Sequence, residues 1–222
     1  MAIPPLLSPK LDEIRRQSQQ QGKFSWTSAQ YQADVLDLVY DKRKSGSAVI
    51  EVGCYKGGLT VQLALVCKEI GAHLYSMDID RTATLSARDL LKNCNLLDVA
   101  TIYDGTLASF ARAMRAIPKP IVCILDGDHS YPAVRSDLKA VEALASRPAA
   151  LVFHDYSLRH PTTDERVDEA LRDHFGKDSR PRPIGQQMNG TAHATQQNPQ
   201  PDGHYWQVPG SEGAILLLDA DS

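Results

Sequence analysis

Two carboxylates and an imidazole follow directly after an apolar run in the middle of the chain. The run ends at Leu125, and Asp126, Asp128 and His129 come next in the stretch ILDGDHSYPAV, residues 124–134. Buried charges are costly unless they are paired or bind something. Carboxylates bind cations, and an imidazole with a pKa of about 6.5 exchanges a proton near neutral pH. The stretch therefore predicts either a helix cap or a chemical site.

Four other apolar runs also end in polar residues. Any one acid–glycine turn is most often a turn and a helix cap, and we interpret Thr106 and Ser130 as such caps. Five coincident endings favour a ligand site, because the carboxyl ends of parallel strands meet at one edge of a sheet and ligands bind there. The candidate residues at these five ends are Glu51, Gly53, Tyr55, Gly57, Gly58, Asp78, Asp104, Gly105, Thr106, Asp126, His129, His154 and Asp155.

Apolar strand patterns alternate with amphipathic helix patterns along the chain, which is typical of α/β proteins. Strands that are apolar throughout fit a sheet covered on both faces. The sequence therefore predicts one Rossmann-like, doubly wound α/β domain with a mostly parallel seven-stranded sheet and helices on both faces. The predicted strands are residues 48–52, 73–77, 99–103, 121–125, 149–153, 182–185 and 214–219, and the predicted helices are residues 9–21, 27–44, 58–70, 83–94, 107–116, 132–145 and 164–175.

Two regions lie outside the alternation. Residues 1–45 are predicted to form an N-terminal helical extension to the main domain, residues 46–222. Residues 186–213 form a long polar stretch, which we interpret as a mobile cover or specificity loop because loops of this length are usually functional or disordered. Trp26 and His204, one from each region, are the candidates for recognising a substrate. The residues interpreted as packing or surface residues are His73, His160, His174, His193, Tyr205 and Trp206.

The composition is that of a globular protein. The 222 residues are 42% apolar and 23% charged, with a net charge of -3. This balance leaves no basic surplus to neutralise phosphates, which argues against a nucleic-acid partner. No apolar run approaches the roughly 18 residues of a membrane span, and the first residues do not resemble a secretory signal. The four cysteines form no C-x-x-C pair and are interpreted as reduced thiols. We expect a cytoplasmic protein without a membrane partner.

Three motifs within residues 47–156 resemble those of class I S-adenosylmethionine-dependent methyltransferases. VIEVGCYKGGLT is similar to the first motif of that family, YSMDID to the second, and YDGTLASF to the segment beside the adenine. The resemblance implies S-adenosylmethionine as cofactor and a methyltransferase domain over residues 46–222. The cofactor-binding residues that it implies are Asp78 at the ribose, Glu51, Gly53, Tyr55, Gly57 and Gly58 around the cofactor, Asp104, Gly105 and Thr106 beside the adenine, and Asp126.

Two further stretches, LDGDHSY and VFHDY, resemble one branch of this family. That branch includes macrocin-type and mycinamicin-type sugar O-methyltransferases and proteins that carry the name cephalosporin hydroxylase. The resemblance implies that Asp126 and Asp155 bind Mg²⁺, and that Asp126 and His129 are catalytic, with His129 as the base. The sequence departs from the branch at His154, which stands where the branch has the first of two adjacent acids. Whether Asp128 replaces that carboxylate is left open.

The predicted function is methyl transfer from S-adenosylmethionine to a hydroxyl group of a small molecule, a sugar or a natural product. Methyl transfer is an in-line displacement, so the enzyme mainly aligns the nucleophile and the methyl group. The hydroxyl proton goes to His129 as general base, or a divalent ion on Asp126 and Asp155 lowers the pKa of the hydroxyl. The sequence does not choose between these two routes.

Two other functions stay open at this point. The first is an NAD(P)-dependent enzyme, although the G-x-x-x-G-G spacing after the first strand differs from the G-x-G-x-x-G of dinucleotide sites. The second is a binding or assembly protein that keeps the fold and has no chemistry. The apolar face of the predicted helix at residues 27–44 packs either on its own domain or on a second subunit, so a homo-oligomer also stays open.

Overall fold

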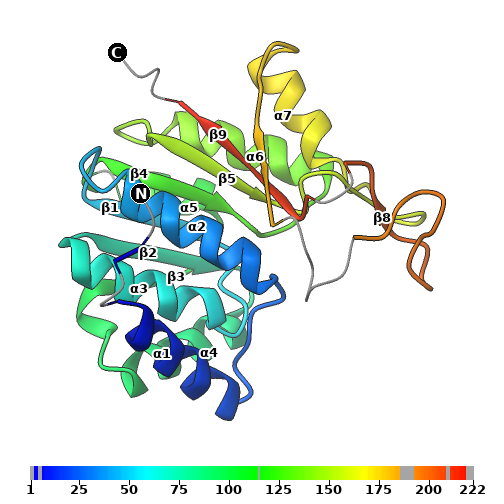
Figure 1. Ribbon diagram of the computed structural model, residues 1–222. Coiled ribbons are helices and arrows are strands. Elements are labelled where there is room, and N and C mark those ends of the chain that lie inside the picture. The colour runs from blue at the N-terminus through cyan, green and yellow to red at the C-terminus, as the bar shows by residue number, and fades with distance from the viewer. Residues whose placement is uncertain (1–2, 5–6, 115, 186–192, 209–210, 219–222) are drawn as a thin grey trace.

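A seven-stranded sheet runs through the centre of the computed structural model, which describes residues 3–4, 7–114, 116–185, 193–208 and 211–218 (Figure 1). The strand order is β3-β2-β1-β4-β5-β9-β7. Strands β1 to β5 are parallel, β9 is antiparallel to both β5 and β7, and β7 at the edge therefore runs in the same direction as β1 to β5. The strands are β1 Ala48–Val52, β2 His73–Asp78, β3 Ala100–Asp104, β4 Pro120–Leu125, β5 Ala150–His154, β7 Arg182–Ile184 and β9 Gly213–Leu217. The predicted fold class is confirmed.

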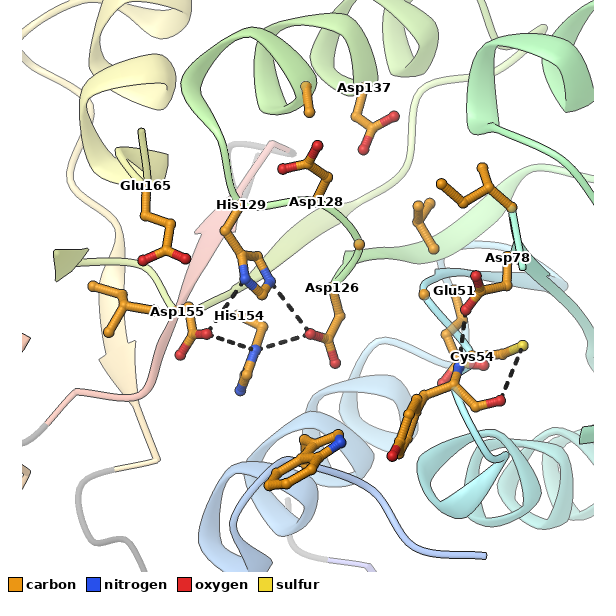
Figure 2. Close-up of a pocket in the computed structure, with 18 of the residues that line it drawn as sticks. Glu51, Cys54, Asp78, Asp126, Asp128, His129, Asp137, His154, Asp155 and Glu165 are labelled. Carbon is orange, nitrogen blue, oxygen red and sulfur yellow. Dashed lines mark hydrogen bonds and ion pairs between the residues drawn. The ribbon is translucent and has the colours of Figure 1, made fainter. Parts of the chain in front are cut away.

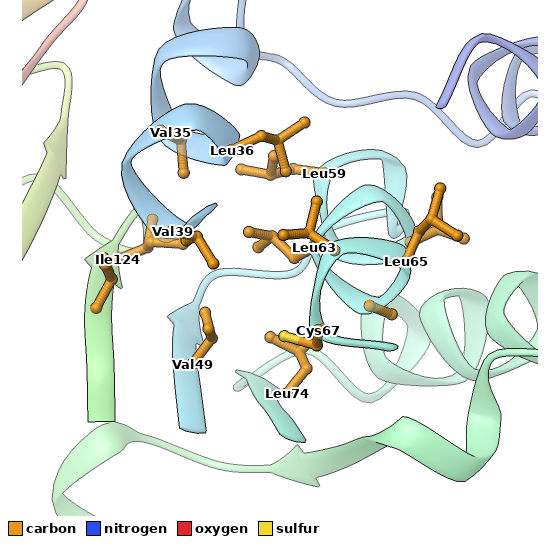
Figure 3. Close-up of a cluster of buried hydrophobic side chains, with 14 of the residues drawn as sticks. Val35, Leu36, Val39, Val49, Leu59, Leu63, Leu65, Cys67, Leu74 and Ile124 are labelled. Atoms are coloured by element: carbon orange, nitrogen blue, oxygen red, sulfur yellow. The ribbon is translucent and has the colours of Figure 1, made fainter. Parts of the chain in front are cut away.

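Helices cover both faces of the sheet because strand side chains alternate between the two sides. Val49 and Ile124 point into one apolar cluster with α1 to α4, whereas Ile50 and Cys123 point into a second cluster with α5 to α7. Figure 3 shows the first cluster, where Val39 and Leu63 pack near Val49 and Ile124. The helices are α1 Ser8–Gln20, α2 Ala29–Asp41, α3 Gly58–Ile70, α4 Arg81–Asn93, α5 Leu107–Ala113, α6 Tyr131–Glu142 and α7 Val167–Phe175, with a short 3-10 turn at Leu97–Val99.

The N-terminal helices are part of the main core. Ser28 begins α2 as its N-cap, since its side-chain oxygen accepts a hydrogen bond from the backbone N–H of Tyr31 over 3.1 Å. Tyr31, Val35 and Val39 are fully buried on the apolar face of α2, which packs against α3 within the same chain. The apolar face of this helix is therefore covered by its own domain.

Four predicted helices are shorter than their sequence patterns. The helices predicted at residues 27–44 and 132–145 are α2 and α6, which end at Asp41 and Glu142, and the other two are α5 and α7. Residues 107–116 were expected to be one helix with Met114 on its apolar side, but α5 ends at Ala113, and Met114 is the C-cap residue with a 36% exposed side chain. The chain turns here toward β4, and Pro118 follows within a few residues. The start of α7 lies at Val167 rather than residue 164, because Glu165 pairs as an isolated bridge with Ser130.

The predicted loop at residues 186–213 includes a strand. Strand β8, Tyr205–Trp206, pairs antiparallel with β6, Leu158–Arg159, and Trp206 is 4% exposed. Residues 186–192 and 209–210 of this segment, and the predicted end of the last strand at residue 219, lie outside the described residues. Among the helices that the structure describes, none is long and apolar enough to cross a membrane.

Candidate functional site

A pocket of about 840 Å³ opens at the carboxyl ends of β1, β2, β4 and β5 (Figure 2). Strand order reverses between β1 and β4, which is where α/β sheets bind ligands. The volume lies within the range of about 300–1,000 Å³ that is typical of small-molecule sites. Four further segments line the pocket beside the strand ends. They are the N-terminal segment before α2, the start of α6, residues 158–165 and the segment that contains β8.

The loop after β1 is fixed against the end of β2. Gly53 has a positive φ of 89°, and a Cβ at this position would overlap the carbonyl oxygen of Asp126, so only glycine fits here. Tyr55 also has a positive φ, 45°, and its backbone N–H donates to Oδ2 of Asp78 over 3.0 Å. Such backbone conformations in residues other than glycine gather at functional sites. Gly53, Tyr55 and Asp78 thus form one rigid wall of the pocket.

Gly57 and Gly58 do not line the pocket. Gly57 has a φ of 92°, and a Cβ there would lie 2.9 Å from the Cα of Ala87 in α4. A Cβ on Gly58 would overlap the backbone of Phe24 and Ser25. Both glycines allow other segments to approach the start of α3 closely, and their contact with a cofactor stays a prediction.

The ends of β2 and β3 offer a second set of polar groups. Oδ1 of Asp78 accepts a hydrogen bond from the N–H of Asp80 over 3.0 Å, so backbone donors hold both of its carboxylate oxygens in place. Gly105 and Thr106 line the pocket, whereas Asp104 is exposed and does not. Thr106 is the N-cap of α5, as expected, because its Oγ1 accepts from the N–H of Ser109 over 3.2 Å.

Glu51 is a buried carboxyl group at the floor of the pocket. Its side chain is 1% exposed and accepts a hydrogen bond from the hydroxyl of Ser76. Burial raises the pKa of Glu51 to about 8, because desolvation outweighs the hydrogen bond from Ser76 that favours the charged form. Glu51 is therefore protonated at neutral pH.

Two histidines and two aspartates meet on the other side of the pocket, as the dashed lines in Figure 2 show. Oδ1 of Asp126 lies 3.5 Å from Nε2 of His129 and 2.8 Å from Nδ1 of His154. Oδ2 of Asp155 lies 3.3 Å from Nδ1 of His129 and 3.6 Å from Nδ1 of His154. Asp155 has a positive φ of 47°, so the backbone after β5 is held in an uncommon conformation at this site. We call these four residues the His–Asp cluster.

A buried acid supports the cluster from behind. Nε2 of His154 is 3.1 Å from Oε1 of Glu212, which is 1% exposed and also accepts a 2.8 Å hydrogen bond from the backbone N–H of Ser28. The Glu212 carboxylate therefore joins β5, the segment before β9 and the start of α2.

Opposite charges outweigh burial in the His–Asp cluster. Desolvation alone would raise the pKa of Asp126, but His154 and His129 lower it to about 2. Desolvation likewise opposes charging of His154, yet Asp126, Asp155 and Glu212 raise its pKa well above the usual value. The pKa of His129 is also raised, since the nearby carboxylates of Asp126 and Asp155 outweigh the effect of burial. Asp126 is thus ionised at neutral pH.

The chain matches known methyltransferases in sequence pattern and in structure. Residues 50–156 match a family model described as a methyltransferase domain, Methyltransf_24. An O-methyltransferase from Bacillus cereus in complex with S-adenosylhomocysteine has a TM-score of 0.61 and 14% identity, over 93% of this chain and 90% of that chain. A Klebsiella pneumoniae protein provisionally described as an O-methyltransferase has a TM-score of 0.62 and 18% identity, over 96% and 90% of the two chains. This is the Rossmann-like fold of the methyltransferases.

Another solved structure with the methyltransferase fold is also similar. The O-methyltransferase TomG from Streptomyces achromogenes, which is involved in tomaymycin synthesis and was solved with S-adenosylmethionine, has a TM-score of 0.56 and 12% identity, over 93% and 88% of the two chains. No curated protein sequence matches the chain significantly.

The residues present do not fit magnesium. Mg²⁺ prefers six oxygen ligands in near-octahedral geometry. The predicted ligands Asp126 and Asp155 do lie together, but Nδ1 of His154 lies within 3.6 Å of an oxygen of each. Asp128 does not replace the missing acid in the cluster, because its Oδ1 accepts from the N–H of Ser130 in the turn before α6. A nitrogen donor thus occupies the position between the two carboxylates.

Sequence reasoning missed one member of the site and gave another no role. Glu212 was not considered, because it lies 58 residues from its partner in a polar segment without a motif. His154 was among the candidates at the strand ends, but it was otherwise noted only as a departure from the branch pattern. His160, interpreted as a surface or packing residue, lines the pocket. Trp26 and His204, the candidates for substrate recognition, line it as well.

Proposed function

We propose that this protein is an S-adenosylmethionine-dependent O-methyltransferase that methylates a hydroxyl group of a small molecule, such as a sugar or a natural product. One observation carries this proposal: a single pocket has the rigid Gly53–Tyr55–Asp78 wall on one side and the His–Asp cluster on the other. Such a pocket offers a cofactor subsite and a proton-accepting subsite next to each other. Cofactor-bound neighbours with the same fold support the choice of cofactor.

The cofactor subsite is proposed at the ends of β1, β2 and β3. The carboxylate of Asp78 is held by two backbone N–H groups and has lone pairs left to accept hydrogen bonds from ribose hydroxyls. Gly105 and Thr106 lie where the adenine is expected, and Ile79, 76% exposed, adds an apolar surface to this part of the pocket. The protonated carboxyl of Glu51 lies at the floor, beneath the loop of Gly53.

The acceptor hydroxyl is proposed to lose its proton at Asp126 and His129. Both residues line the pocket, and Asp155 orients the ring of His129 from its other nitrogen. A base must come within hydrogen-bond reach of the proton that it accepts. The position of this pair opposite Asp78 supports its role as the place where the nucleophile is activated.

Aromatic side chains at the pocket wall support a small cyclic acceptor. Trp26 is 72% exposed, and its ring lies 6.2 Å from that of Tyr55 and 5.8 Å from that of Phe24. Exposed aromatic faces pack well against the apolar faces of sugar and aromatic rings. The net charge of -3 supports the absence of a nucleic-acid substrate. The four free cysteines fit a reducing compartment, and we place the protein in the cytoplasm.

A methyl-transfer assay tests this proposal. Purified protein is incubated with methyl-labelled S-adenosylmethionine and a panel of sugar and natural-product hydroxyl acceptors. We expect label in at least one acceptor, and we expect His129→Ala to lose transfer while it still binds S-adenosylhomocysteine. Silence across the panel, combined with failure of the folded protein to bind S-adenosylhomocysteine, would overturn the proposal. Binding of NAD(P) instead would favour the alternative of an NAD(P)-dependent enzyme.

A further inference from the structure

We infer that Asp126, His129 and His154 form a binding site for a divalent first-row transition-metal ion of the Mn²⁺ to Zn²⁺ series, with selectivity against Mg²⁺. The three side chains each present one donor atom, and these atoms all lie within 4.8 Å of one another. They come from the ends of two neighbouring parallel strands, β4 and β5, and the turn after β4. The site therefore rests on rigid elements.

The spacing of the donor atoms fits one shared ion. Oδ1 of Asp126 lies 2.8 Å from Nδ1 of His154 and 3.5 Å from Nε2 of His129. Two ligands with bonds of about 2.1 Å to one ion, at angles of about 90–110°, lie roughly 3.0–3.4 Å apart. Small side-chain shifts would bring the three atoms to these distances.

Two buried ring nitrogens lack hydrogen bonds in this cluster. Nδ1 of His154 and Nε2 of His129 are shielded from solvent and have no hydrogen-bond partner among the described residues. His154 as a whole is 6% exposed. The 2.8 Å approach of His154 to Asp126 is thus a close contact without the alignment of a hydrogen bond. Unpaired buried polar atoms are rare in folded proteins, and an ion between these atoms would satisfy both nitrogens.

The opposite nitrogen of each ring faces a carboxylate. Nε2 of His154 bonds to Glu212, which leaves the lone pair of Nδ1 directed at the cluster. Nδ1 of His129 lies 3.3 Å from Oδ2 of Asp155, which leaves Nε2 directed at Asp126. Metal-binding histidines usually donate their second N–H to a carboxylate or a carbonyl, which fixes the tautomer and the ring orientation. Both histidines show this arrangement.

The donor types select the class of ion. Imidazole nitrogen is a good ligand for zinc, iron, nickel and copper, whereas magnesium is bound by oxygen. Two imidazoles and one carboxylate also leave coordination positions free, and the cluster faces the 840 Å³ pocket. If the proposed function holds, a bound ion would lower the pKa of the acceptor hydroxyl. His129 is then a ligand in the metal-bound protein and the proton acceptor of the proposed function in the metal-free protein.

Metal titration of the full chain tests this inference. Protein treated with a chelator and then dialysed is titrated by calorimetry with Zn²⁺, Co²⁺, Mn²⁺ and Mg²⁺, and the visible absorption of bound Co²⁺ reports on its ligands. We expect one Zn²⁺ or Co²⁺ per chain and at least 100-fold weaker binding of Mg²⁺. His154→Ala should weaken Co²⁺ binding at least 100-fold. The matched control is His174→Ala, since His174 pairs with Glu142 outside the pocket and should leave binding within twofold of wild type.

Two more variants keep the test decisive if His154→Ala does not fold. His154→Asp restores an oxygen donor between Asp126 and Asp155 and should shift the preference from Co²⁺ toward Mg²⁺. Glu212→Gln should weaken Co²⁺ binding about 10–100-fold, the usual effect of losing an outer partner of a ligand. The inference is overturned if folded wild-type protein binds Mg²⁺ as tightly as Co²⁺, or binds no transition ion. S-adenosylhomocysteine affinity, measured on the same samples, separates this failure from a failure of the proposed function.

Discussion

His154 and Glu212 form a buried pair in which Nε2 of the imidazole lies 3.1 Å from Oε1 of the carboxylate, although the residues are 58 positions apart. Glu212 also accepts hydrogen bonds from the backbone N–H and the hydroxyl of Ser28, the N-cap of α2. One carboxylate thereby joins the N-terminal helices, strand β5 and the segment just before β9. The same carboxylate orients the imidazole that faces Asp126, so the stability of this corner and the geometry of the site depend on one side chain.

Glu212→Ala should destabilise the protein strongly. The substitution leaves the His154 imidazole and the two Ser28 donors without their partner in a buried place, and breaking a buried ion pair costs about 3–5 kcal/mol. Urea unfolding measures this loss. The control Glu142→Ala removes an exposed partner of His174, and such surface pairs contribute about 0–1 kcal/mol. Equal effects of the two substitutions would show that Glu212 does not hold this corner together.

Gly53→Ala should cost more stability than an alanine at another glycine with positive φ. Gly71 has a φ of 70°, and no atom lies within 4 Å of the place that a Cβ would take, so Gly71→Ala carries only the backbone strain, about 1 kcal/mol. Gly53 has the same kind of strain, and in addition the new methyl group would overlap the carbonyl of Asp126. We expect a loss of about 3 kcal/mol or more for Gly53→Ala in chemical denaturation. Similar losses of stability for Gly53→Ala and Gly71→Ala would contradict the close approach of the turn at Gly53 to the carbonyl of Asp126.

Glu51 should make the protein less stable as the pH rises. The folded carboxyl keeps its proton up to about pH 8, whereas the unfolded chain releases it near pH 4.5. The folded state therefore binds more protons between these values, and stability is lost as the pH rises through this window. Glu51→Gln removes this titration. Between pH 5 and pH 9 the melting temperature of the variant should therefore drop less than that of wild type, by a difference of a few degrees. Parallel pH curves for the two proteins would argue against a protonated Glu51.

The positions of the strands along the chain were predictable, because the apolar runs that indicate strands are local features of the sequence. Residues 121–125 are apolar throughout, residues 48–52 are apolar except for Glu51, and Asp126 and Gly53 follow them, as is typical of buried parallel strands. Helix ends were less predictable, since tertiary contacts set them. The apolar periodicity after Phe110 continues past Ala113, but the turn toward β4 ends the helix there.

The part of the site that lies at the ends of the parallel strands was predictable from the sequence. Asp78, Asp126, His129 and Asp155 all line one pocket because parallel strands bring their carboxyl ends to one edge. Glu212 lies just before the antiparallel strand β9, whose position next to β5 is a result of tertiary folding and has no sequence pattern. The role of His154 depends on that acid, so it too became visible only in three dimensions.

The most direct test of the account is calorimetry with S-adenosylhomocysteine on wild type, Asp78→Ala and Asp80→Ala. Asp80 is an exposed N-cap that accepts from the N–H of Thr82, so its substitution controls for a nearby lost carboxylate. We expect one micromolar site in wild type and about 10–100-fold weaker binding in Asp78→Ala, the loss expected for hydrogen bonds to a charged group of about 1.5–3 kcal/mol. Asp80→Ala should bind within a few-fold of wild type. Absence of binding by folded wild-type protein, or equal affinity of the Asp78→Ala variant, would contradict the proposed cofactor site.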